Sequence, residues 1–262
     1  MNILIAGYKG FIGNKVKEVL ESNGHQVWRF DRDSSIKYGP ICHCDIFINC
    51  AGEVKDEDKM IEDNLIFASR IAYACKIFNK RLIHLGTIVE RTKDDLYSNT
   101  KKAATNLILG MARGGANFCV ASPATVFGPG DHSSSFIESM VQACIKGDKY
   151  PLYGDSRDWI YIDDLAVAIL KIVESEKTRN TCFEIGYGKP FGNVSVYETI
   201  SSIIGGKEPN YKTIYTGKTW YADTVAINDL GWTPKVGMIA GLRRYIEARE
   251  FTGAWVGAEA SS

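Results

Sequence analysis

Short segments without a helical period alternate with longer helical segments, and this alternation constrains the fold more than any other feature of the sequence. The strand-like runs are residues 2–6, 26–30, 45–50, 81–85, 117–121 and 181–185. Several of them are apolar throughout, which is typical of strands buried on both faces. Strands of this kind that alternate with helices predict an α/β fold, a Rossmann-type doubly wound parallel sheet.

The segments between and after these runs repeat their apolar residues at helical spacing. We expect helices at residues 14–22, 58–78, 96–113, 136–146, 163–174, 196–204 and 238–250. After residue 126 the sequence changes to a loop rich in Gly, Pro and Ser, FGPGDHSSS, and then to a mixed stretch rich in aromatic residues. A length of 262 residues allows one large unit or one domain with a modest second lobe, and the change after residue 126 favours the second lobe.

The charge balance argues against two classes of partner. The chain has 31 Lys and Arg against 31 Asp and Glu, whereas a protein that binds nucleic-acid phosphates needs an excess of Lys and Arg. We therefore expect no nucleic-acid partner. Its longest apolar runs are far shorter than the roughly 20 residues of a membrane span, and no charged-then-apolar signal segment stands at the N-terminus. We expect a cytoplasmic protein without a membrane partner.

The seven cysteines are an odd number without a Cys-x-x-Cys pair, which is typical of reduced core thiols. Cys42, His43 and Cys44 form one local cluster, in which an extended backbone would place alternate side chains on one face. A metal ion would need two further ligands, and no second cluster has zinc-like spacing. We therefore predict no metal site.

A glycine-rich turn joins the first predicted strand to the first predicted helix. Gly7, Gly10 and Gly13 enclose Phe11 and Ile12 in a GxxGxxG spacing. In this context Gly7 permits a tight turn, Gly10 lets the backbone approach a pyrophosphate, and Gly13 lets the helix pack on the sheet. The N-terminus of the helix offers unpaired N–H groups to the anion. The turn therefore predicts a dinucleotide site.

Asp31 lies at the end of the second predicted strand, 18 residues after Gly13. A carboxylate there accepts hydrogen bonds from the two hydroxyls of an adenosine ribose and repels a 2′-phosphate, so it favours NAD over NADP. The adjacent Arg32 keeps NADP possible, because its guanidinium can pair with such a phosphate.

Tyr97 and Lys101 start another predicted helix with a spacing of four residues, which places the phenol and the ammonium on one helical face. Catalysis by a phenol at pH 7 requires a shift of its pKa by about three units, or roughly 4 kcal/mol. A fixed ammonium and an oxidised nicotinamide supply such stabilisation. We interpret the pair as catalytic, because a dinucleotide turn precedes it and a strand leading to Thr87 lies between them.

With these motifs the sequence resembles the extended short-chain dehydrogenase/reductase family, the NAD-dependent nucleotide-sugar epimerases and dehydratases, over nearly the whole chain. The segments similar to the motifs of that family are GYKGFIG (7–13), DIFINCAG (45–52), PATVFGPG (123–130), YPLYGDSRDWIYIDDL (150–165) and CFEIGYG (182–188). The resemblance implies a dinucleotide-binding domain at residues 1–126, to which 160–186 return, and a small substrate-binding lobe at 127–159 and 187–262.

The resemblance also implies roles for single residues. Tyr97 would exchange a proton with a sugar hydroxyl, Lys101 would hold the nicotinamide ribose and lower the pKa of the tyrosine, and Thr87 would orient the sugar oxygen. The other residues implied to contact the cofactor are Ala51, Gly52, Asn64, Pro123, Ala124 and Thr125. Arg157 would bind the diphosphate of a nucleotide sugar; a salt bridge to Asp158 or Asp163 is the structural alternative.

Three segments depart from the family pattern. In HLGTIVERT the hydroxyl position is filled by Thr87 or falls on Gly86, depending on register, and we favour Thr87. The loop from Thr87 to Tyr97 is shorter than is usual, which predicts a more open sugar pocket. The stretch 33–44 leaves little room for a third strand and its helix, so the sequence does not predict the adenine contact usually made there.

Dehydratases of the family place Asp-Glu directly after the catalytic threonine, where this chain has Ile88 and Val89. We therefore expect dehydration to be disfavoured, and we interpret the nearby Glu90 as part of the loop surface. A 4-epimerase is the leading expectation, because the preference of Asp31 for NAD favours a cofactor that is reoxidised within each turnover. A nucleotide-sugar 4-ketoreductase is the alternative.

Two further hypotheses stay open. The chain could be a catalytically inactive NAD-sensing binding protein, as its short loop suggests, or an oxidoreductase that acts on a small aldehyde or ketone. The family resemblance also implies a homodimer that is built from helices 58–78 and 96–113.

Overall fold

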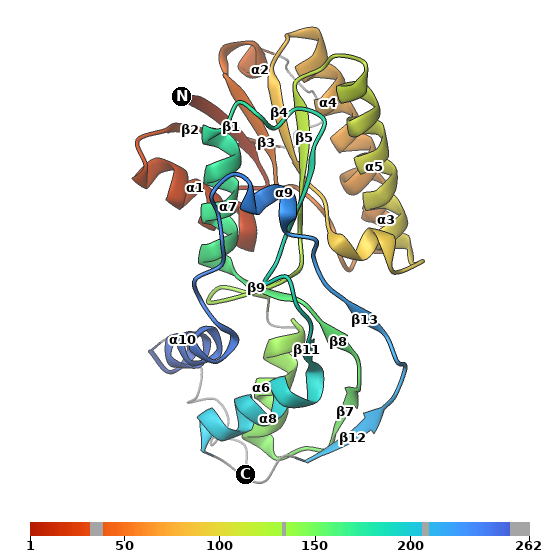
Figure 1. Cartoon of the computed structure of the whole chain (residues 1–262), viewed down its shortest axis with the longest axis vertical. Helices are drawn as coiled ribbons and strands as arrows, with labels where there is room; N and C mark the ends of the chain where they lie inside the picture. The colour runs from red at the N-terminus through yellow and green to blue at the C-terminus, as the bar shows by residue number, and fades with distance from the viewer. Residues whose placement is uncertain (32–38, 133–134, 206–209, 252–262) are drawn as a thin grey trace.

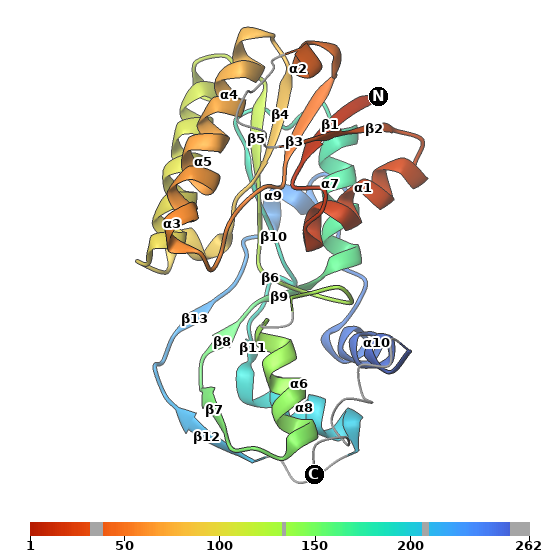
Figure 2. The same cartoon turned by 180° about the vertical axis from the view of Figure 1, so that it is seen from behind.

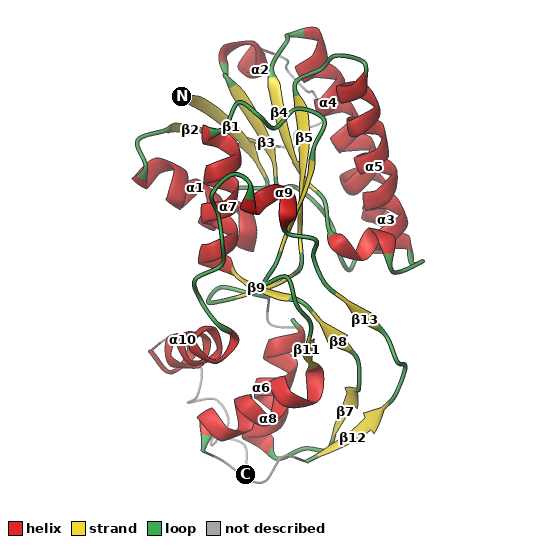
Figure 3. Ribbon diagram, viewed as in Figure 1, coloured by secondary structure: helices red, strands yellow, loops and turns green. Residues whose placement is uncertain are grey.

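The computed structural model describes residues 1–31, 39–132, 135–205 and 210–251. Its larger lobe contains a six-stranded parallel sheet (Figures 1 and 3). The strands follow one another across the sheet in the order β10-β5-β4-β3-β1-β2, and every neighbouring pair is parallel. Their bounds are β1 (Asn2–Ala6), β2 (Gln26–Phe30), β3 (Ile46–Asn49), β4 (Arg81–Leu85), β5 (Phe118–Pro123) and β10 (Cys182–Ile185). The predicted Rossmann-type fold is confirmed.

Side chains on each central strand alternate between two apolar clusters, one on each face of the sheet. Ile3 and Ile5 of β1 belong to the cluster that contains residues of α1 (Phe11–Ser22) and α7 (Ile162–Glu174). Leu4 and Ala6 belong to the cluster on the other face, with α4 (Phe67–Ile77) and α5 (Leu96–Arg113). Figures 1 and 2 show these helix pairs on opposite faces. Burial on both faces explains why the strands are apolar throughout.

The direction of winding reverses at β1. From β1 the chain goes first to β2 on one side and then to β3 on the other, so a switch point lies between β1 and β3. In open α/β sheets, ligands bind outside the carboxyl ends of the strands at such a point. Gly7 follows β1 there, and Cys50 follows β3.

The helix expected at 58–78 consists of three parts. They are α3 (Glu57–Met60), the π-helical turn η1 (Ile61–Ile66) and α4. The π-helical turn contains Asn64, whose side chain is fully buried and hydrogen-bonded. Single π-helical turns within α-helices are frequent at functional sites, and the apolar period alone does not reveal them.

The carboxyl ends of the strands face a smaller lobe, which is drawn below the sheet in Figure 1. Its helices are α6 (Phe136–Lys146), α8 (Asn193–Ile204) and α10 (Met238–Phe251); α9 (Val225–Asn228) lies beside β10 instead. Its short strands are β6 (Thr125–Phe127), β7 (Tyr150–Tyr153), β8 (Ser156–Arg157), β9 (Trp159–Tyr161), β11 (Phe191–Gly192), β12 (Tyr211–Ile214) and β13 (Thr219–Trp220). The cluster on the α1 and α7 face continues without interruption into α6, α8 and α10.

The cluster of Cys42, His43 and Cys44 differs from its expected conformation. Residues up to His43 form the short helix α2 (Gly39–His43) instead of an extended segment, and the thiols of Cys42 and Cys44 donate to backbone carbonyls three residues earlier in the chain. The alternation of side chains that was expected on one extended face is therefore wrong. All seven cysteines are free thiols.

Among the described residues β2 is an edge strand, and α2 is the only element between β2 and β3. Part of the compressed stretch, residues 33–38, lies outside the described residues. In the described part of the chain, no helix combines the length and the apolar character that crossing a membrane requires.

Candidate functional site

A long cleft runs along the carboxyl ends of the strands. One part, of about 610 Å³, lies between Gly7, Phe30 and Asp31, and the other, of about 740 Å³, lies between the glycine turn, the end of β4 and the smaller lobe. The two parts share Gly10, Cys50, Ala51 and Gly52, so they are continuous. The cleft therefore begins at the switch point that the strand order defines.

The glycine turn packs against the segment after β3 with almost no space. A Cβ atom on Gly7, whose φ is +75°, would lie 2.6 Å from the backbone nitrogen of Ala51. A Cβ on Gly13 would lie 2.2 Å from the carbonyl oxygen of Gly7, so α1 begins directly against the turn. A Cβ on Gly10 meets only that carbonyl oxygen, at 3.3 Å, and otherwise faces the cleft. These contacts explain the need for glycine at positions 7 and 13, whereas Gly10 keeps the cleft free of a side chain.

The N–H groups at the N-terminus of α1 have no capping side chain in the first turn of the helix. Gly10 is the N-cap and supplies no side chain, and the first turn contains no acidic residue. The first N–H groups of a helix have no intrahelical acceptor, so this end of α1 can bind an anion. Phe11, Ile12 and Gly13 line the cleft at this end.

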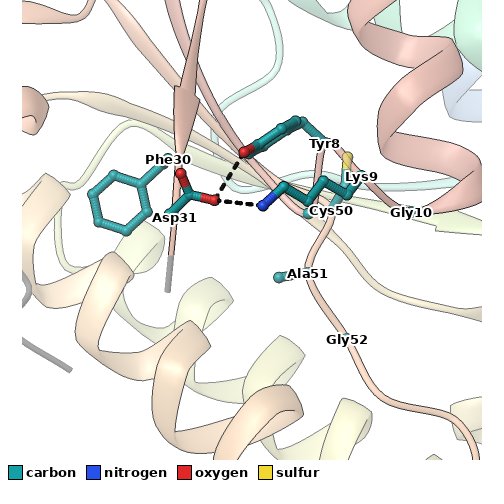
Figure 4. A pocket seen from close by; sticks show the side chains of 9 residues that line it. Tyr8, Lys9, Gly10, Phe30, Asp31, Cys50, Ala51 and Gly52 are labelled. Atoms are coloured by element: carbon teal, nitrogen blue, oxygen red, sulfur yellow. Dashed lines mark hydrogen bonds and ion pairs between the residues drawn. The ribbon is translucent and has the colours of Figure 1, made fainter. Parts of the chain in front are cut away.

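Asp31 occupies the far end of the cleft (Figure 4). Its Oδ1 accepts hydrogen bonds from the Tyr8 hydroxyl at 2.8 Å and from Lys9 Nζ at 3.3 Å. These two donors hold the pKa of the carboxyl below its usual value, the Tyr8 hydroxyl having the larger effect. The carboxylate is therefore ionised, exposed and already oriented by the turn. Arg32, the other residue expected near a ribose phosphate, lies outside the described residues.

Tyr97 and Thr87 meet in the larger part of the cleft. The Thr87 hydroxyl caps η2 (Ile88–Arg91) and makes a side-chain hydrogen bond with Tyr97, whereas a Cβ on Gly86 would clash with Ser122. Burial raises the pKa of Tyr97 to about 12, and the hydrogen bond with Thr87 acts in the opposite direction. Of the two alternatives for the hydroxyl position, Thr87 and Gly86, the structure brings Thr87 to the phenol of Tyr97.

Lys101 follows Tyr97 one turn later on α5 and is 4% exposed. Its Nζ donates to the carbonyl oxygen of Leu85, at the end of β4, at 2.5 Å. Burial lowers the pKa of Lys101 to about 8, although Glu90 and Cys50 favour its charged form. The group that lowers the pKa of Tyr97 in this structure is Thr87, while the ammonium is held by the backbone.

Glu90 is not part of the loop surface, so that expectation is wrong. Its Oε2 accepts from the Thr105 hydroxyl on α5 at 3.0 Å, and burial raises the pKa of this carboxyl. Its charge interacts with that of Lys101. The 3₁₀ turn of η2 directs Glu90 towards α5, and this direction depends on packing that the sequence of the loop does not reveal.

Arg157 lines the cleft, and the carboxylates considered as its partners bind elsewhere. Asp158 accepts the backbone N–H groups of Tyr187, Gly188 and Ala222, and Asp163 lies 3.2 Å from Lys15 Nζ. The guanidinium carbon of Arg157 lies 4.4 Å from the ring centre of Phe136 and 4.9 Å from that of Trp220. The side chain is therefore held between aromatic rings.

The remaining residues that were expected to contact the cofactor fall into two groups. Ala51, Gly52, Pro123, Ala124 and Thr125 line the cleft. Asn64 lies behind its wall, where its side chain bonds to the backbone N–H and C=O of Glu53 and to Thr100. Asn64 thus fixes the segment after β3 against α5.

Several residues that line the cleft were not expected from the sequence. Tyr8 and Lys9 stand inside the glycine turn, and this position between Gly7 and Gly10 could have predicted that they line the cleft. Lys93 stands in the short loop before Tyr97, and Trp220 comes from β13, which pairs with β8. Trp220 had no local signal, because its place depends on the pairing of distant segments. No cluster of three His, Cys, Asp or Glu residues suited to a metal ion occurs among the described residues.

Comparison with known proteins identifies relatives of this chain. A curated dTDP-glucose 4,6-dehydratase of Mycolicibacterium smegmatis is 26% identical over 230 residues, which cover 76% of this chain and 68% of that protein. A UDP-glucose 4-epimerase from Thermotoga maritima, solved with UDP-glucose, has a TM-score of 0.81 at 22% identity, covering 96% of this chain and 99% of that one. A dTDP-glucose 4,6-dehydratase from Bacillus anthracis, solved with NAD, has a TM-score of 0.83 at 20% identity over 97% and 98% of the two chains.

These relatives correct one expectation. Dehydration was expected to be disfavoured, but the curated relatives from M. smegmatis and Escherichia coli are named dTDP-glucose 4,6-dehydratases. The expectation rested on the absence of carboxylates at Ile88 and Val89 alone. Carboxylates reach the cleft from other segments, since Glu53 and Asp131 both line it.

A family model matches residues 3–186, from the first strand to the end of the sheet. Its description is the NAD dependent epimerase/dehydratase family, which confirms the resemblance to the extended short-chain dehydrogenases/reductases. The matched span contains the glycine turn, Thr87, Tyr97, Lys101 and Arg157. The chain belongs to the NAD-dependent epimerase/dehydratase family.

Proposed function

We propose that the chain is an NAD-dependent enzyme that oxidises and reduces the C4 position of the sugar in a nucleotide sugar. The observation that carries this proposal is the group of Thr87, Tyr97 and Lys101 in one cleft with the N-terminus of α1. The printed names of the relatives, 4,6-dehydratases and a 4-epimerase, support C4 as the reacting carbon, because a 4-keto sugar is common to both reactions.

The cleft fits a dinucleotide. Its two parts meet at Gly10, where a pyrophosphate would receive the unpaired N–H groups of α1, and Asp31 at the far end would accept the ribose hydroxyls. Lys101 would hold the second ribose near Tyr97. When bound, NAD supplies the acceptor for the hydride that leaves the sugar carbon.

Tyr97, in its phenolate form, would accept the proton of the C4 hydroxyl while Thr87 orients the sugar oxygen. The phenol is neutral in the structure, with its pKa raised to about 12 by burial. The hydrogen bond from Thr87 and the positive charge of an oxidised nicotinamide would both stabilise the phenolate. In the reverse direction the same phenol would return its proton to the sugar oxygen.

The experiment that tests this proposal identifies the product. The protein is incubated with NAD and either UDP-glucose or dTDP-glucose in D₂O, and the sugar is analysed by NMR. We expect conversion, either to the C4 epimer without deuterium or to a 4-keto-6-deoxy sugar with deuterium at C5, since elimination of water removes the C5 proton. NAD binding without conversion of any nucleotide sugar would contradict the proposal and favour a sensing protein.

Asp31 provides a separate prediction for the cofactor. In Asp31→Asn the carboxylate that would accept the ribose hydroxyls becomes an amide, and we expect the affinity for NAD to fall by about tenfold, the effect of a hydrogen bond to a charged group. The affinity for NADP should rise relative to NAD, because the repulsion of a 2′-phosphate is removed while Lys9 stays beside it. Calorimetric titration with both cofactors measures this ratio. An unchanged ratio would show that Asp31 does not contact the ribose.

We also propose that the chain forms a homodimer through α4 and α5. Large apolar side chains are exposed on this side, among them Tyr73 at 55% and Ile77 at 56% of α4 and Leu96 at 37% of α5. Ile108 of α5 is buried on the sheet and is not part of this surface. Sedimentation at several concentrations should give the mass of two chains, and a single-chain mass throughout would reject the dimer. The cytoplasmic location stays a prediction.

A further inference from the structure

The loop between Thr87 and Tyr97 carries a lysine, Lys93, into the cleft. The loop is short, and its backbone is fixed, because the N–H of Lys93 donates to the carbonyl oxygen of Val89 at 2.9 Å. Two residues later, Asp95 caps α5 by accepting from the N–H of Ser98. Lys93 is therefore held between two anchored elements on the rim of the site, and its side chain lines the cleft.

The side chains of Lys93 and Arg157 meet at the same aromatic ring. Lys93 Nζ lies 5.6 Å from the ring centre of Trp220, and the guanidinium carbon of Arg157 lies 4.9 Å from it. Trp220 is 5% exposed, so its ring is a fixed part of the wall. A flat aromatic ring stabilises a cation over its face, and here one ring contacts two cations.

The two cations repel each other. Besides burial, the charge of Arg157 lowers the pKa of Lys93. In the described part of the chain neither forms an ion pair, and the buried Nε of Arg157 has no hydrogen-bond partner. The charges of Asp95 and Asp155 favour the charged form of Lys93, but each carboxylate bonds to another group: Asp95 caps α5, and Asp155 accepts from the Thr216 hydroxyl. Two neighbouring cations that form no ion pair favour a ligand with at least two negative charges.

We propose that Lys93, together with Arg157, binds the diphosphate of the nucleotide sugar. This inference rests on the proposed function and adds to it a binding residue from the short loop. Both cations line the part of the cleft that contains Tyr97, so a diphosphate bound between them would leave the attached sugar close to the phenol. The short loop before Tyr97 would thus supply a charge for the diphosphate, the group next to the sugar.

The test compares Lys93→Met with Lys212→Met. The first removes the charge in the cleft and keeps the apolar stem against Trp220; the second removes an exposed charge on β12, away from the cleft. UDP, dTDP and the corresponding nucleosides are titrated by calorimetry. Loss of a charged contact should weaken the binding of the better nucleoside diphosphate by about tenfold or more in Lys93→Met. Affinity for the nucleoside and for NAD should stay unchanged, and Lys93→Arg should restore most of the diphosphate affinity.

The outcomes separate this inference from the proposed function. If the wild-type chain binds a nucleoside diphosphate and Lys93→Met binds it equally well, the assignment of Lys93 is wrong while the proposed function stands. If the wild-type chain binds no nucleoside diphosphate, both are wrong. A fall in NAD affinity of the same size as that for the diphosphate would show that Lys93 only supports the shape of the cleft. Thermal unfolding of each variant verifies that the fold is retained.

Discussion

Replacing Tyr97 by phenylalanine is expected to lower the turnover of a nucleotide sugar by about 10² to 10⁴, the range that a positioned acid or base contributes. The substitution removes one oxygen atom and keeps the ring that lines the cleft. Thr87 then lacks its phenol partner, and the sugar hydroxyl has no group to receive its proton. The rate of sugar conversion measures the effect, and titration with NAD tests whether the cofactor site is intact.

A matched control is available in Tyr215→Phe. Tyr215 is 83% exposed and does not line the cleft, so its loss of a hydroxyl should leave turnover and NAD affinity unchanged. Turnover similar to wild type in Tyr97→Phe would reject Tyr97 as the group that exchanges the proton. A loss of NAD affinity as large as the loss of turnover would instead indicate a role in cofactor binding.

The second large effect is expected at Gly13. In Gly13→Ala the new Cβ would lie 2.2 Å from the carbonyl oxygen of Gly7 and 2.7 Å from its carbonyl carbon. Gly7 cannot retreat, because it already packs against the backbone of Cys50 and Ala51. We expect α1 to be displaced at a cost of about 1–3 kcal/mol in the free energy of unfolding, as for other overpacked sites, together with loss of NAD binding. Thermal unfolding and calorimetry measure the two effects.

Gly10→Ser is expected to weaken NAD binding without lowering the stability of the fold. A Cβ at Gly10 meets only the Gly7 carbonyl oxygen, at 3.3 Å, and serine is a favourable N-cap, so the unfolding temperature should stay near that of wild type. Its hydroxyl would nevertheless bind the N–H groups of α1 that a pyrophosphate needs, and NAD affinity should fall. If Gly13→Ala were as stable as wild type, the close packing of α1 on the turn would not be a requirement. If Gly10→Ser bound NAD normally, the pyrophosphate would lie elsewhere.

The sheet and its helices could be predicted because their signals lie within single segments. The bounds of β1, β2, β4, α5 and α6 agree with the expected ranges, since burial on two faces or one helical face leaves a period that can be read locally. The small strands of the second lobe have no such signal. Two-residue strands such as β8 and β13 exist through pairing with distant segments, and the sequence contains no period for them.

The same distinction applies to the site. The glycine turn, Asp31 and Lys101 were expected from spacing and Thr87 from the family resemblance, and the structure brings them to one cleft or its walls. The position of Glu90 against Thr105 and of Lys93 over Trp220 depends on how the 3₁₀ turn packs on α5 and on β13. Tertiary contacts determine where these side chains point. A residue of a short loop can therefore be identified from the sequence, but the residue that it contacts cannot.

The apolar cluster that runs from the sheet into α6, α8 and α10 restricts how the cleft can move. A hinge between the two walls would expose this cluster to water, at about 25 cal/mol for each Å² of apolar surface. The walls are therefore expected to stay together and to unfold as one cooperative unit. Entry and release of ligands would then depend on rotations of side chains at the rim, such as those of Lys9, Lys93 and Tyr8, and not on closure of one body upon another.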